Sequence, residues 1–102
     1  MPIGIELQSP QGAVIASLTD FDDVLHTTLP YYDDATFQLL NKIDWYGDTE
    51  FEATQIAVLL RELDRIVPKA ADADQVRFLN KLKQILIRCV ATPGSKLKFL
   101  GD

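Results

Sequence analysis

Two stretches in the second half of the chain carry apolar residues at helical spacing, and each predicted helix must cover an apolar surface. The first spans about residues 49–67 and is ended by Pro68. The second begins at a cap supplied by Asp72 or Asp74 and ends at the Thr-Pro-Gly sequence at 92–94. The inward positions of the two helices are Ile56, Leu59, Leu60, Leu63, Ile66, Val67, Phe78, Leu79, Leu82, Ile85, Leu86, Cys89 and Val90.

Strand patterns flank these helices at both ends of the chain. Residues 3–8 alternate between apolar and polar, which predicts a half-buried strand. Residues 9–12 read as a turn, and residues 13–18, apolar on both faces, predict a more buried partner in a hairpin. Residues 96–100 alternate again, with Leu97 and Phe99 inward. Because three strands are far more stable than two, we expect this last strand to join the hairpin.

The chain of 102 residues is therefore expected to form a single domain over residues 1–102. Its predicted fold class is α+β, a two-layer sandwich with a three-stranded antiparallel or mixed sheet on two long amphipathic helices. Residues 19–34 are predicted to be mostly irregular, with a short helical turn near 22–26. Residues 34–43 predict a short helix capped by Asp34, with Phe37, Leu40 and either Ile43 or Leu39 inward.

The residue inventory argues against most catalytic chemistry. One histidine, His26, and one cysteine, Cys89, are too few ligands for a zinc site, and Cys89 on an apolar helix face is expected to be inert. No phosphate-binding glycine motif and no nucleophile elbow are present. We expect no enzyme, no cofactor and no metal. The longest apolar run, residues 56–60, is too short for a membrane span, so we expect a cytoplasmic protein.

Charge is distributed unevenly along the chain. Residues 1–52 hold ten acids and one base, which gives −9, whereas residues 53–102 hold five acids and nine bases, which gives +4. This asymmetry predicts an acidic surface for a basic partner and argues against nucleic acid. The alternative is internal compensation, in which the acids lie beside the bases or are simply solvated. The predicted second helix carries a basic stripe formed by Arg77, Lys81, Gln84 and Arg88.

The segment 43–55, Ile-Asp-Trp-Tyr-Gly-Asp-Thr-Glu-Phe-Glu-Ala-Thr-Gln, concentrates the acids. Thr49 and Glu52 have the spacing of a capping box, and Gly47 would allow a sharp bend into the helix. These three residues are therefore predicted to start the helix. The carboxylates do not follow the spacing of a calcium loop.

Helix capping leaves four residues of this segment unexplained: Asp44, Trp45, Tyr46 and Asp48. The sequence repeats the same aromatic and acidic composition at Tyr31, Tyr32, Asp33 and Asp34. Together these eight residues are the candidate partner-binding surface, because exposed Tyr and Trp are common binding hot spots and carboxylates steer a basic partner. The alternative is that the aromatic side chains form a lid over one end of the core.

Residues 43–63 resemble a small, largely uncharacterised family of bacterial proteins. Its core has the form I-D-x-Y-G-D-T-x-F-N-x-x-Q, followed by L-x-x-E-L and a final F-x-G-D. The matching residues are Ile43, Asp44, Tyr46, Gly47, Asp48, Thr49, Phe51, Gln55, Leu59, Glu62, Leu63, Phe99, Gly101 and Asp102. The resemblance covers about residues 37–102 and departs at Glu52, where the pattern has Asn.

This family is similar in size and acidity to immunity proteins that neutralise bacterial toxins. The resemblance implies that Gln55 and Glu62 belong with the loop, and a buried polar link from either residue to the loop backbone is the structural explanation. The leading hypothesis is a non-catalytic module that inhibits a basic toxin through the acidic aromatic surface. The alternative is a structural or adaptor domain that self-associates through a sheet edge, so either a monomer or a weak dimer is expected.

Overall fold

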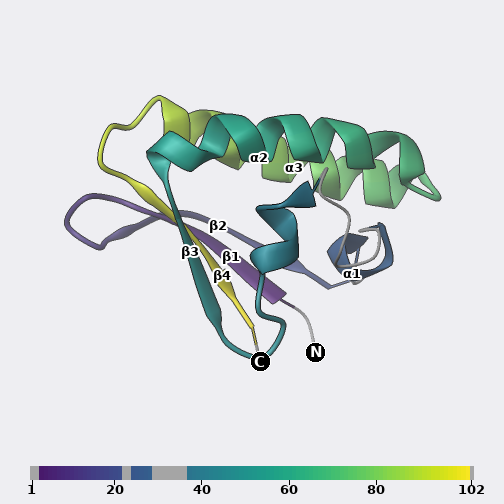
Figure 1. The fold of residues 1–102 in the computed structure, drawn as a ribbon, viewed down its shortest axis with the longest axis horizontal. Helices are drawn as coiled ribbons and strands as arrows, with labels where there is room; N and C mark the ends of the chain where they lie inside the picture. Colours follow the sequence, from purple (N-terminus) through teal and green to yellow (C-terminus); the bar gives the residue numbers. More distant parts are fainter. Residues whose placement is uncertain (1–2, 22–23, 29–36, 102) are drawn as a thin grey trace.

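The computed structural model describes residues 3–21, 24–28 and 37–101 (Figure 1). Four strands and two long helices account for most of these residues. In chain order the elements are β1 (Ile3–Gln8), β2 (Val14–Asp20), α1 (Val24–Thr28), η2 (Leu40–Lys42), β3 (Asp48–Glu52), α2 (Ala53–Ile66), η3 (Val67–Lys69), α3 (Ala73–Val90) and β4 (Lys96–Leu100).

The strands form one antiparallel sheet in the order β2-β1-β4-β3. Helices α2 and α3 pack against each other and lie over one face of this sheet (Figure 1). The predicted α+β class is confirmed, and β4 joins the N-terminal hairpin as expected, with Ile5 opposite Phe99. The sheet differs from the prediction because it has four strands rather than three. The layer above it also includes α1 and η2, which contribute the buried residues Leu25 and Leu40.

The fourth strand occupies residues that the sequence assigned to the start of a helix. In β3, Phe51 points inward and is buried, whereas Asp48, Glu50 and Glu52 are exposed, so the segment alternates with the period of a strand. The Phe51 ring meets the Phe99 ring of β4 edge to face, with 5.7 Å between centroids. This aromatic contact, together with pairing to β4, stabilises an extended conformation that helical capping would prevent.

The predicted capping box of Thr49 and Glu52 is therefore wrong. Helix α2 begins at Ala53, Glu52 is its N-cap, and the Gln55 Oε1 accepts a hydrogen bond from the Glu52 N–H at 2.9 Å. Helix α3 begins at Ala73, and of the two predicted caps it is Asp72 whose carboxylate accepts from the Gln75 N–H at 2.9 Å. Helix α2 ends at Ile66, just before Pro68, and continues into the short η3 turn.

Strand β2 is the second correction, because the more buried strand predicted for residues 13–18 is an edge strand. Among the described residues it pairs with β1 only, and Val14 and Ser17 are exposed. Its apolar residues on both faces do not reflect burial on both faces: α3 covers only part of the strand, and the outward face meets solvent.

The segment between β2 and β3 is built from short turns. The Asp20 carboxylate is buried and accepts from the N–H groups of Val24 and Leu25 at 2.8 and 2.9 Å, which starts α1. Helix α1 lies close to the predicted helical turn at 22–26. The short helix predicted over 34–43 is a 3-10 turn, η2, although Phe37, Leu40 and Ile43 are buried as expected. The expected cap, Asp34, lies outside the described residues.

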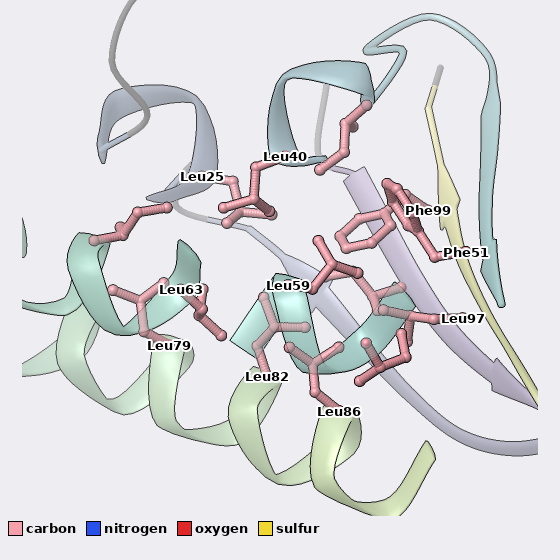
Figure 2. Close-up of a cluster of buried hydrophobic side chains, with 14 of the residues drawn as sticks. Leu25, Leu40, Phe51, Leu59, Leu63, Leu79, Leu82, Leu86, Leu97 and Phe99 are labelled. Atoms are coloured by element: carbon pink, nitrogen blue, oxygen red, sulfur yellow. The ribbon is translucent and has the colours of Figure 1, made fainter. Parts of the chain in front are cut away.

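The core is a single cluster to which strands and helices all contribute. In Figure 2, Leu25 and Leu40 lie above leucines of α2 and α3, and Phe51 lies beside Phe99 at the sheet. Burial is nearly complete for Ile5, Leu7, Leu25, Leu40, Phe51, Ile56, Leu59, Leu63, Ile66, Leu79, Leu82 and Phe99. The opposite face of the sheet, which we call the open face, carries polar and charged residues from β1, β3 and β4.

Candidate partner-binding surface

The turn formed by residues 44–47, which we call the tip turn, connects η2 to β3. Asp44 organises it locally: its Oδ1 accepts from the Tyr46 N–H at 2.9 Å, and its carbonyl accepts from the Gly47 N–H at 3.4 Å. The Asp44 N–H donates to Thr49 Oγ1 at 2.9 Å. Aspartate commonly stabilises turns by accepting from a backbone N–H two residues on. Thr49 therefore supports the tip turn, instead of capping α2.

The end of β4 lies directly against the tip turn (Figure 1). The Gly101 N–H donates to the Gly47 carbonyl at 2.7 Å. A Cβ on Gly101 would stand 2.6 Å from both the Asp44 carbonyl oxygen and the Gly47 nitrogen, closer than atoms can approach. A Cβ on Gly47 would stand 2.7 Å from Asp44 Oδ2. Gly101 is thus needed for close approach to the backbone of the tip turn, whereas a Cβ on Gly47 would displace only the end of the Asp44 side chain. Gly47 does not make the predicted bend into a helix.

The two aromatic residues of the tip turn have different roles. Trp45 is partly buried and packs against the core, as the lid alternative predicts. Tyr46 is 85% exposed, and the carboxylates of Asp44 and Asp48 on either side of it are exposed as well. The candidate surface within the described residues therefore reduces to Asp44, Tyr46 and Asp48. Tyr31, Tyr32, Asp33 and Asp34 lie outside the described residues.

Some of the acidic charge near this surface is compensated by β4. Asp48 is 3.7 Å from the Lys98 ammonium, and Lys98 also stands between Glu6 and Glu50 across the open face. In the next row, Lys96 pairs in register with Glu52. Internal compensation thus applies to the acids of β3. It does not apply to Asp44, which has no cation within ion-pair distance in the part of the chain that the structure describes.

Glu62 is the buried acid that supports the segment leading into the tip turn. Its side chain is on the inner side of α2, only 4% of the residue is exposed, and its two oxygens accept from the N–H groups of Leu39 and Leu40 at 3.2 and 3.0 Å. The expected link from Glu62 to backbone is present, although it reaches residues 39–40, ahead of the turn. A glutamate among the apolar positions of α2 was the sequence signal for it.

Metal-ligating side chains and Cys89 were the other candidates that the sequence offered for a functional site. Residues 3–21, 24–28 and 37–101 contain no group of three or more His, Cys, Asp or Glu side chains placed to hold a metal ion. Cys89 is buried, with Sγ 3.3 Å from Ser95 Oγ. Over the same residues, neither long helix has the length and apolar composition needed to cross a membrane.

Comparison of the chain with protein-family models, with curated proteins and with solved structures finds no match. The functional argument therefore rests on the geometry of this chain.

Proposed function

We propose that this protein is a non-catalytic protein-binding module that docks a basic protein partner through the tip turn and its flanking carboxylates. The finer form of the proposal is an immunity-type inhibitor whose partner is a basic bacterial toxin domain. The binding set in the described residues is Asp44, Tyr46 and Asp48.

The observation that carries this proposal is an exposed tyrosine on a turn that is already ordered. The Tyr46 N–H bonds to the Asp44 carboxylate, and hydrogen bonds with Thr49 and Gly101 hold the rest of the tip turn in place. The Tyr46 side chain is nevertheless 85% exposed. Binding through a preorganised turn avoids much of the ordering cost of a flexible loop. A tyrosine supplies a large contact area with only two side-chain torsions to fix.

Electrostatics favour a cationic partner for this turn. Asp44 and Asp48 are exposed on either side of Tyr46, and the sequence as a whole carries a net charge of −5. Exposed carboxylates around an aromatic anchor accelerate encounter with a basic surface, and this effect weakens as salt is added.

The direct test is calorimetric titration against a purified basic toxin domain encoded beside this protein's gene. We expect Tyr46→Ala to raise Kd at least about tenfold, as loss of a central aromatic anchor does. Asp44→Lys should slow association mainly at low salt. Phe21→Ala is the matched control, because Phe21 is also strongly exposed, at 81%, but lies at the end of β2, on the far edge of the sheet. Equal affinity of wild type, Tyr46→Ala and Asp44→Lys for that domain would rule the tip turn out.

A structural or adaptor domain that self-associates is the second candidate. The observation in its favour is that β2 and β3 are both edge strands of the described sheet. An open edge offers unpaired backbone groups to a second strand. A mass by light scattering that stays that of one chain at high protein concentration would count against self-association.

A further inference from the structure

A groove lies along the edge strand β2, beneath the first half of α3. Its volume is about 410 Å³, and it is lined on the strand side by residues 17–19 and Phe21. Four α3 residues line the helix side: Asp74, Arg77, Phe78 and Lys81. Because β2 and β3 are opposite edges of the sheet, this groove is remote from the tip turn and independent of the function proposed for it.

The strand side of the groove offers backbone hydrogen bonds. β2 is seven residues long and, within the described chain, pairs with β1 alone. One side of its backbone therefore lacks a neighbouring strand. An edge of this kind binds an extended segment by adding it to the sheet as a further strand.

The helix side of the groove determines which side chains such a segment should carry. Leu18 and Phe78 are partly buried and supply apolar surface. Arg77 is paired with Asp74 at 2.7 Å, whereas Lys81 is exposed and has no acid within ion-pair distance among the described residues. The described lining thus carries one uncompensated positive charge beside an apolar surface. A carboxylate on the incoming strand would meet that charge.

A second copy of this chain does not supply that carboxylate. The one acid in the lining, Asp74, is already paired with Arg77, so two β2 edges brought together would place two uncompensated Lys81 side chains at one interface, where like charges repel. The acidic edge strand β3 is no better, because Asp48, Glu50 and Glu52 project from the open face, opposite α2 and α3. Charge therefore favours a different protein as the occupant.

We infer that the groove between β2 and α3 is a docking site for an extended segment of another protein, added to the β2 edge, with a carboxylate facing Lys81. The segment would extend the sheet from four strands to five. Side chains at the intervening positions of the segment would lie over the outward face, next to Ser17 and Thr19.

The test is an NMR titration of the 15N-labelled full chain, at low ionic strength, with a peptide of alternating glutamate and valine as long as β2. We expect saturable shifts of backbone amides in β2 and in the first half of α3, and none in the tip turn. Lys81→Glu should raise the Kd of the peptide about threefold, which is the size of effect typical of one exposed ion pair. Lys42→Glu, the same change at an exposed lysine outside the groove, should leave the affinity as in wild type.

Two altered peptides separate strand addition from simple charge attraction. A version with glutamine in place of glutamate should bind wild type more weakly, and this order should reverse in Lys81→Glu, because the introduced carboxylate repels glutamate. Methylation of the backbone nitrogens on one alternating set of residues removes the donors that face β2, so one of the two possible methylated sets should abolish binding.

Three results would overturn the inference: no saturable shifts, shifts centred on β3, or binding that tolerates both methylation patterns. Shifts of the β2 amides on raising the protein concentration without peptide would also overturn it, because the edge would then be taken by a second copy. None of these outcomes depends on the tip turn, so failure here leaves the proposed binding surface intact.

Discussion

At the scale of single residues, backbone contacts and one buried carboxylate hold the tip turn in place. Gly101 allows the end of β4 to touch residues 44 and 47, and Glu62 holds the segment just before the turn. Glu62 is buried and Gly101 is partly buried, so neither is placed to contact a partner directly. Their effect on function would come through the position of Tyr46.

Gly101→Ala should destabilise the protein by about 1–3 kcal/mol, because the added Cβ would overlap backbone atoms that cannot move independently. Urea denaturation measures this. Gly4→Ala is the matched control: its Cβ would meet Leu100 side-chain atoms at 3.7 Å or more, an ordinary contact. Equal urea midpoints for Gly101→Ala and wild type would show that the end of β4 is not in close contact with the tip turn.

Glu62→Gln should cost about 1–3 kcal/mol, because the amide has one oxygen in place of two and leaves a buried N–H group poorly paired. Hydrogen exchange should quicken at Leu39 and Leu40, whose N–H groups bond to Glu62. Glu50→Gln, at an exposed position on the open face, should change stability by no more than about 0.5 kcal/mol. Unchanged exchange at Leu39 and Leu40 in Glu62→Gln would contradict this assignment.

At the scale of elements, each long helix begins at a specific cap, and the two caps differ in how far the sequence reveals them. Asp72 stands directly before α3 and bonds to Gln75, three residues on, which is a purely local arrangement. The start of α2 follows a strand without any intervening loop, so its cap, Glu52, is also the last residue of β3. The strand thus fixes where the helix begins.

Asp72→Ala should destabilise α3 by about 0.5–2 kcal/mol through loss of the N-cap. Its neighbour Asp74 gives a close control. Asp74→Ala removes only an exposed ion pair with Arg77, worth about 0–1 kcal/mol. Thermal unfolding followed by circular dichroism at 222 nm compares the two; a larger loss for Asp74→Ala would show that the helix begins later than the structure places it.

At the scale of the whole molecule, one core joins both layers. Helices α1, α2 and α3, the η2 turn and strands β1, β3 and β4 all contribute buried residues to a single cluster, and Trp45 packs against it from the tip turn. The sheet has one face on this core and an open face where Lys98 stands between Glu6 and Glu50. An antiparallel sheet with one solvated face is a common solution for a small domain.

A single core predicts a single cooperative unfolding transition. Trp45 is the only tryptophan, so its fluorescence reports on the tip turn, while far-ultraviolet circular dichroism reports mainly on α2 and α3. The two urea curves should coincide. A fluorescence midpoint clearly below the dichroism midpoint would show that the tip turn opens on its own, and would weaken its role as a preorganised binding surface.

Elements with long or strictly periodic patterns could be predicted from the amino-acid sequence alone. Helix α3 and most of α2 follow from apolar spacing, and β1 and β4 from their alternation, because these patterns depend only on which face of a local structure is buried. The joining of β4 to the hairpin followed from the need for a third strand. Those elements were enough to give the α+β class.

Features that depend on a neighbour distant in the sequence could not be predicted and became visible in the fold. Residues 48–52 alternate over too short a length to be told from a helix start, and β4, more than forty residues later, holds them extended. The exposure of β2 depends on its position at the sheet edge, which its own apolar residues do not reveal. The tip turn divides into a partly buried Trp45 and an exposed Tyr46 because the core lies on one side of it. In each case the deciding contact is remote in sequence, so no local pattern could carry it.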